Sequence, residues 1–186
     1  GDRASTNRPS GTEVLSVVND CAKMRPDILQ RAAARGTEVH RVCAAIAKGL
    51  HAPRTPEEIR GYVDSFRRWF ENVEDVLLVE TRLKDPLYRY HGTPDLVVRL
   101  KGDQAPRVID LKTPGALGSL WAAQISAYER LFTANGGMEC EHSGTLRLRQ
   151  DGSRPIFDEC RHGESNLHAF LCALTAYRHF KQEDGS

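Results

Sequence analysis

Two stretches in the middle of the chain decide the expected fold: Gly92-Thr-Pro-Asp95-Leu-Val-Val98 and Arg107-Val-Ile-Asp110-Leu-Lys112-Thr113. Both are rich in valine, isoleucine or leucine, which favour β-strands, and the turn at Gly102-Asp103 separates them. Alternate residues of a strand share a face, so Asp110 and Lys112 project to one side while their neighbours pack on the other. An acid and a lysine at the end of a buried strand are costly to bury unless they bind something.

A second acid, Asp95, begins the preceding strand, and we expect its carboxylate to meet that of Asp110 in space. Two carboxylates that converge on one point favour a hard cation such as Mg²⁺ or Mn²⁺. Such an ion lowers the pKa of a bound water and neutralises charge on a phosphate, and Lys112 is placed to orient that water. Gln124 and Tyr128 are four residues apart on the next predicted helix, so they share a face that can hold the lysine or a substrate backbone.

The segments around these strands alternate between helical and extended periodicity. Predicted helices cover residues 26–34, ended by Gly36, and then residues 37–50, 55–70, 117–134 and 165–181. Predicted strands cover residues 76–83, 88–91, 95–101, 107–112, 144–149 and 155–160. This order predicts an α/β fold with a mixed central β-sheet flanked by helices and an N-terminal helical segment. We expect residues 1–11 to form a flexible arm and residues 12–186 to form a single domain.

The composition indicates a soluble globular protein. Of the 186 residues, 40% are hydrophobic and 27% charged, and the apolar runs are far shorter than the roughly 20 residues that cross a bilayer. The five cysteines include no Cys-x-x-Cys pair, so a zinc site or an iron–sulfur cluster lacks its usual close ligands. Scattered thiols and the lack of a leader pattern favour a cytoplasmic protein. The net charge is only +1, although residues 1–70 carry 12 Lys and Arg against 8 Asp and Glu, a weak bias that suits a polyanion.

In this order of motifs the sequence resembles the PD-(D/E)XK nuclease superfamily, and within it the RecB-like and phage-type exonuclease branch. The resemblance spans residues 35–128 and rests on Arg35-Gly36-x-x-x-His40, Glu80 in a strand, Gly92-x-x-Asp95, Ile109-Asp110-x-Lys112-Thr113 and Gln124-x-x-x-Tyr128. It implies a restriction-endonuclease-like core and a metal-dependent deoxyribonuclease that acts in DNA recombination, repair or phage DNA processing.

The resemblance also implies a set of metal ligands. Asp95 and Asp110 would hold one or two Mg²⁺ or Mn²⁺ ions, together with His40 and the backbone carbonyl of Ile109. The close-spaced cysteines of cluster-containing members are missing, so no iron–sulfur cluster is expected. The chain has no Gly-x-x-x-x-Gly-Lys-Ser/Thr motif, so any helicase would be a separate chain.

The other motif residues have supporting roles in this interpretation. Lys112 would serve the attacking water, Glu80 would line the site, and Gln124 and Tyr128 would support it. Several of these signals also have a plain structural alternative. Glu80 can be a charged strand residue facing solvent, Tyr128 a core aromatic, and His40 a helix histidine with satisfied hydrogen bonds.

Three functions stay open at this point. The leading prediction is a DNA exonuclease, and the first alternative is an endonuclease that uses the same site on flaps, junctions or a recognition sequence. The second alternative is a nucleic-acid-binding module that has lost catalysis. The expected partners are DNA, a recombination or single-strand-annealing protein and further copies of the chain, in a bacterial or phage-infected cytoplasm and without a membrane.

Overall fold

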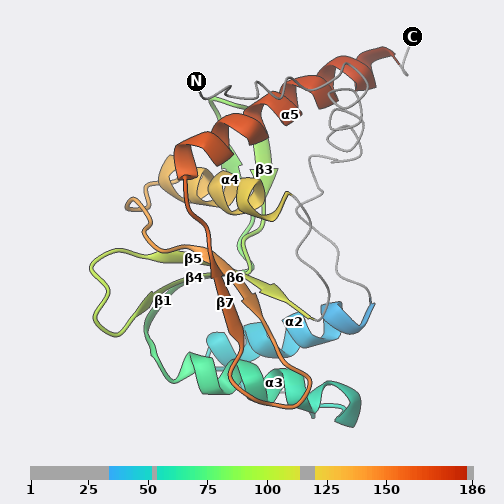
Figure 1. Cartoon of the computed structure of the whole chain (residues 1–186), viewed down its shortest axis with the longest axis vertical. Coiled ribbons are helices and arrows are strands. Elements are labelled where there is room, and N and C mark those ends of the chain that lie inside the picture. Colours follow the sequence, from blue (N-terminus) through green and yellow to red (C-terminus); the bar gives the residue numbers. More distant parts are fainter. Residues whose placement is uncertain (1–33, 52–53, 114–119, 184–186) are drawn as a thin grey trace, which may run out of the picture.

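The computed structural model describes residues 34–51, 54–113 and 120–183 (Figure 1). The helices are α2 (Ala34–Ala47), α3 (Glu57–Phe70), α4 (Trp121–Ala134) and α5 (Gly163–Glu183). The strands are β1 (Val73–Val79), β2 (Leu83–Asp85), β3 (Tyr90–Gly92), β4 (Leu96–Leu100), β5 (Arg107–Lys112), β6 (Gly144–Arg147) and β7 (Ile156–Glu159). No helix in these ranges is long and apolar enough to pass through a bilayer.

A mixed five-stranded sheet lies at the centre, in the order β1-β4-β5-β6-β7. β5 and β6 are parallel and the other neighbours are antiparallel. The parallel pair requires a crossover connection, and α4 lies within it. β2 and β3 form a separate hairpin between β1 and β4 in the chain. The expected α/β fold with a mixed sheet and flanking helices is therefore confirmed.

Helices cover both faces of the sheet. α2 and α3 lie on one face, while α4 lies on the other with α5 packed against it (Figure 1). Leu96, Ile109 and Leu111 are buried on the α2/α3 side, and Val97 and Val108 are buried under α4. This alternation along β4 and β5 is the period-two burial that the sequence predicted.

Two predicted boundaries are wrong. Gly36 does not end a helix, because it lies buried inside α2, where the apolar stripe of Val39, Val42 and Cys43 packs into the core. Such packing outweighs the cost of about 1 kcal/mol that glycine adds to a helix interior. The predicted strand 76–83 is two strands, since β1 ends at Val79 and β2 begins at Leu83. The predicted arm 1–11 and helix residues 26–33 lie outside the described residues.

Candidate functional site

Asp95 and Asp110 lie at neighbouring positions where β4 begins beside β5. The last pair of the ladder is Leu96 opposite Ile109, and the two acids come next in that register. The Asp95 carboxylate accepts a hydrogen bond of 2.7 Å from the backbone N–H of Leu111. The backbone carbonyl of Asp95 accepts a second one of 3.0 Å from the N–H of Glu80. Asp95 is therefore held through both its main chain and its side chain.

Asp110 forms an ion pair with Lys112 on the same face of β5. The Lys112 Nζ lies 3.0 Å from Asp110 Oδ2, and Asp110 is only 4% exposed. Burial and the nearby charge of Asp95 raise the pKa of Asp110 to about 6, against the opposing effect of Lys112. Burial alone would lower the pKa of Lys112, but the charges of Asp110 and Asp95 raise it overall, so the lysine stays protonated. The predicted meeting of Asp95, Asp110 and Lys112 is thus present in the structure.

His40 reaches this cluster from α2. Its Nδ1 lies 3.2 Å from Asp95 Oδ1. Burial alone would lower the pKa of His40, but Asp95 and, more weakly, Asp110 raise it overall. The other ring nitrogen, Nε2, is buried and finds no hydrogen-bond partner in the described part of the chain. A buried nitrogen without a partner is costly, so Nε2 is a polar atom whose hydrogen-bonding capacity the described residues leave unused.

Gln124 and Tyr128 approach from α4, on the opposite face of the sheet. Gln124 Nε2 donates a hydrogen bond of 3.3 Å to the Tyr128 hydroxyl, as their spacing on one helical face predicted. Burial, followed by the charges of Asp110 and Asp95, raises the pKa of Tyr128 well above its usual range. Tyr128 also belongs to the core cluster under α4. Tyr128 is therefore a core residue and also a neighbour of the two carboxylates.

Glu80 does not lie in a strand, which corrects the prediction. It follows the end of β1 with a φ of +44°, a conformation that lets the chain leave the sheet and enter the hairpin. Its side chain is exposed, yet it borders a shallow depression with five other residues: His40, Ala44, Asp95, Leu96 and Leu111. Partial burial and the charge of Asp95 raise the pKa of Glu80. Glu80 thus lies near Asp95 and His40, and its role in the site stays a prediction.

The β2–β3 hairpin connects Glu80 to Asp95, and a network around Asp85 fixes it to α4. The Asp85 carboxylate is buried, accepts the N–H groups of Leu87 and Tyr88, and pairs with Arg130 of α4 at 2.7 Å. The Tyr90 hydroxyl donates a 2.8 Å hydrogen bond to a backbone carbonyl of α4. These contacts bring the segment that contains Asp95 into a fixed position beside α4.

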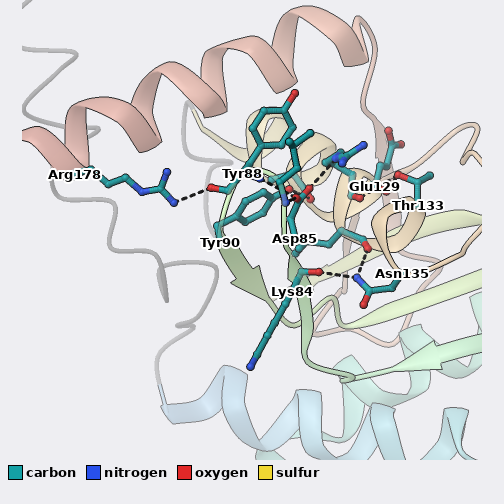
Figure 2. A network of polar contacts seen from close by, with 12 residues as sticks. Lys84, Asp85, Tyr88, Tyr90, Glu129, Thr133, Asn135 and Arg178 are labelled. Carbon is teal, nitrogen blue, oxygen red and sulfur yellow. Dashed lines mark hydrogen bonds and ion pairs between the residues drawn. The ribbon is translucent and has the colours of Figure 1, made fainter.

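A second anchor ties the hairpin to α5. Figure 2 shows the Arg178 side chain reaching the turn, where it donates to the backbone carbonyls of Tyr88 and Arg89, each at 2.7 Å. At the C-terminal end of α4, the Asn135 side chain donates a hydrogen bond of 2.9 Å to the backbone carbonyl of Lys84 in the hairpin. Sequence reasoning missed this network. The only local signal was Asp85 followed by proline, a common turn pattern.

The donors fit a hard divalent cation in their chemistry. Two carboxylates and the His40 ring lie close together, with Nδ1 of the ring against Asp95, and carboxylate oxygen and imidazole nitrogen are ligands that Mg²⁺ or Mn²⁺ accept. The side chains are engaged with one another, and no three His, Cys, Asp or Glu residues of the described ranges are already arranged around one point. Ile109 is buried in the core beside Asp110, and ligation by its carbonyl stays a prediction. Leu111, whose N–H orients Asp95, was not singled out from the sequence.

The chain matches no protein-family model, and no curated protein matches its sequence. The resemblance to PD-(D/E)XK nucleases therefore rests on the motif residues alone.

Proposed function

We propose that this protein is a divalent-metal-dependent DNA nuclease, and specifically an exonuclease that hydrolyses phosphodiester bonds. One observation supports the proposal above the others: Asp95 and Asp110 converge at the junction of β4 and β5, with Lys112 paired to Asp110 at 3.0 Å. Two acids and a lysine at the end of two core strands are the groups that metal-assisted hydrolysis of a phosphodiester needs.

The cost of this arrangement also argues for a ligand. Asp110 is almost fully buried and close to a second negative charge, so its ionised form is disfavoured in the metal-free protein. A buried carboxyl group with such a raised pKa is characteristic of a functional position rather than of a site selected for stability. A divalent cation would favour the ionised form of both acids.

Asp95, Asp110 and His40 would hold Mg²⁺ or Mn²⁺. When bound, the ion neutralises charge on the phosphate and activates a water molecule. Asp95 keeps its orientation through the N–H of Leu111, and its other oxygen contacts Nδ1 of the His40 ring, so an ion shared by Asp95 and His40 would replace that contact.

The protonated side chain of Lys112 has three N–H donors, and one of them is engaged by Asp110. The remaining donors can orient the attacking water or contact a non-bridging phosphate oxygen. Gln124 and Tyr128 stand on the α4 side of the same acids. The amide of Gln124 has a second N–H with which to hold the substrate backbone.

The exonuclease part of the proposal follows from the resemblance of the motif order to the RecB-like and phage-type branch, where His40 belongs to the motif. The same resemblance suggests that the activity serves DNA recombination, repair or phage DNA processing. An exonuclease requires a free end, so covalently closed circular DNA should remain intact while linear DNA of the same sequence is degraded.

The test is a digestion of labelled linear, nicked, single-stranded and circular DNA with Mg²⁺, with Mn²⁺ and with EDTA. We expect metal-dependent loss of linear DNA and a decrease of about 100-fold or more in Asp110→Asn. Asp75→Asn is the matched control, because Asp75 is a half-exposed acid of the same sheet whose partner is Arg99. Inactivity of the wild type on every substrate, or full activity of Asp110→Asn, would contradict the proposal. Cleavage of the circle would favour an endonuclease.

A further inference from the structure

Arg147 lies beside Lys112 at the carboxyl end of the parallel strands. The two residues are register partners in the β5–β6 ladder, so their side chains project from the same face of the sheet. Asp110 lies on that face too, because it is two residues from Lys112. The side chains of Lys112 and Arg147 are 36% and 33% exposed, so each is partly accessible. Strands of a sheet are about 4.8 Å apart, so the two side chains leave the sheet as direct neighbours.

Asp158 on β7 orients the Arg147 guanidinium. Arg147 Nε donates to Asp158 Oδ2 at 2.6 Å, and Nη2 donates to Oδ1 at 3.2 Å. This two-point contact fixes the plane of the group and uses two of its five N–H donors. The remaining donors are available to an anion, and the fork of an arginine matches the oxygens of a phosphate.

The charges around the cluster are asymmetric. Toward β1, Asp95 lies beside Asp110, and Glu80 lies beside Asp95 together with His40 and Lys48. On the other side, Lys112 pairs with Asp110 and Arg147 lies opposite Lys112 on β6, and the turn after β6 adds two exposed arginines, Arg149 and Arg154. Asp151 lies 3.9 Å from Arg149, and within the described residues Arg154 forms no ion pair. A polyanion held at Asp110 meets two carboxylates toward β1 and a run of arginines toward β6, which favours a path across β6.

The turn between β6 and β7 is fixed against α3. Gly61 of α3 approaches it so closely that a Cβ at that position would lie 1.6 Å from the carbonyl oxygen of Gln150. Ser65 accepts the N–H of Arg149 at 3.1 Å, and Arg68 donates to the carbonyl of Gly152 at 2.8 Å. The basic end of β6 is thus a rigid surface, which lowers the entropy cost of binding a ligand there.

We propose that Arg147 binds the phosphodiester adjacent to the one that is cleaved, so that Lys112 and Arg147 form two successive phosphate subsites. The inference rests on the proposed nuclease function and defines the direction in which the DNA strand leaves the site. Arg147 contacts a phosphate that does not react, so it contributes to substrate binding more than to the chemical step.

The experiment compares Arg147→Gln with Arg99→Gln, a matched arginine that also pairs with an aspartate across two strands of this sheet. Binding of a fluorescein-labelled oligonucleotide, single-stranded and duplex, is measured in EDTA by fluorescence anisotropy at several salt concentrations. We expect Arg147→Gln to lose roughly tenfold in affinity. The slope of log affinity against log salt should decrease by about 0.7 to 0.9, the value of one lost phosphate contact. Cleavage should show a similar rise in KM with kcat within about twofold.

A neutral methylphosphonate placed next to the scissile phosphate locates the contact. It should weaken wild-type binding roughly tenfold and have little further effect in Arg147→Gln, because both changes remove the same interaction. Arg147→Gln leaves Asp158 without its partner, so Arg147→Gln/Asp158→Asn, which removes that charge, should show the same loss if the contact is with DNA.

The outcomes separate the two proposals. If the wild type cleaves DNA but Arg147→Gln binds DNA as tightly as the wild type does, the subsite is overturned and the nuclease proposal stands. An equal loss of DNA affinity in Arg99→Gln has the same meaning. Wild-type binding that depends on Arg147 without cleavage of any DNA overturns the nuclease and leaves a phosphate-binding surface. A methylphosphonate penalty that persists in full in Arg147→Gln also overturns the subsite.

Discussion

The carboxylate of Asp95 accepts a hydrogen bond of 2.7 Å from the backbone N–H of Leu111, which lies in the neighbouring strand. The bond closes the end of the β4–β5 ladder with a side chain in place of a main-chain carbonyl. The orientation of one acid of the cluster is therefore set by the strand that carries the other.

This relationship predicts different results for two substitutions of Asp95. Asp95→Asn keeps an oxygen that can accept the Leu111 N–H, so we expect its stability to stay within about 0.5 kcal/mol of the wild type. Asp95→Ala leaves that N–H without its partner and should cost about 1–3 kcal/mol. Urea unfolding measures both, and both should lose nuclease activity. Equal stability of the two variants would show that the hydrogen bond contributes nothing.

The raised pKa of Asp110 predicts a pH-dependent stability of the metal-free protein. A carboxyl group with a folded pKa above its unfolded value stabilises the fold when protonated. The contribution of Asp110 is complete below about pH 4 and is lost as the pH rises through about 6. His40, whose pKa is also raised, contributes with the same sign.

We therefore expect the free energy of unfolding in EDTA to decrease by about 1–2 kcal/mol between about pH 5 and pH 7.5 because of Asp110. Asp110→Asn removes the titrating group, so its profile should be flatter by that amount. Mn²⁺ at pH 7.5 should stabilise the wild type and not the variant. Parallel profiles for the two proteins would contradict the argument.

Lys112→Met should separate metal binding from turnover. The loss of the ammonium removes donors to the water or phosphate, and we expect kcat to fall by about 100-fold. Mn²⁺ affinity, measured by calorimetry, should be unchanged or higher, because a positive charge next to Asp110 has been removed. Lys101→Met is the control, since that exposed lysine contacts the Glu71 carbonyl. A loss of Mn²⁺ uptake in Lys112→Met would assign the lysine to ligand positioning instead.

The contacts of Asp85, which fix the β2–β3 hairpin to α4, predict that their loss lowers both stability and activity. Asp85→Ala unpairs Arg130 and leaves the N–H groups of Leu87 and Tyr88 without their acceptor, so we expect a cost of about 3 kcal/mol. Asp85→Asn can still accept from the two N–H groups and should cost less. Asp151→Ala is the control. It removes the acceptor of the Ser153 N–H in an exposed turn, and we expect the free energy of unfolding to fall by well under 1 kcal/mol. Chemical unfolding gives the values, and nuclease assays should show lower activity for Asp85→Ala through displacement of Asp95.

Local patterns were sufficient to predict the central part of the fold. Alternation along residues 95–101 and 107–112 identified β4 and β5, their shared polar face and the meeting of Asp95 with Asp110. The four-residue spacing of Gln124 and Tyr128 identified their contact on α4. These features depend on residues that are close in sequence or on the geometry of a single element.

The rest depends on contacts between distant segments. Asp85 is fixed by Arg130, 45 residues away, and the hairpin turn by Arg178, about 90 residues away, so nothing near residue 80 showed that the predicted strand would divide. Gly36 is a helix breaker by propensity, and only the packing of α2 against the sheet explains its position inside a helix. The place of Arg147 beside Lys112 likewise required the parallel register of β5 and β6.

The contact at Gly61 has a consequence for how the protein would accommodate a nucleic acid. The backbone of α3 at Gly61 lies directly against Gln150, and hydrogen bonds from Arg149 to Ser65 and from Arg68 to Gly152 tie the helix to the turn. If DNA binds over this end of the sheet, the protein has little freedom to reshape itself, so most of the adjustment falls on the DNA. Sequences that bend or unstack easily would then be favoured without any contact to their bases.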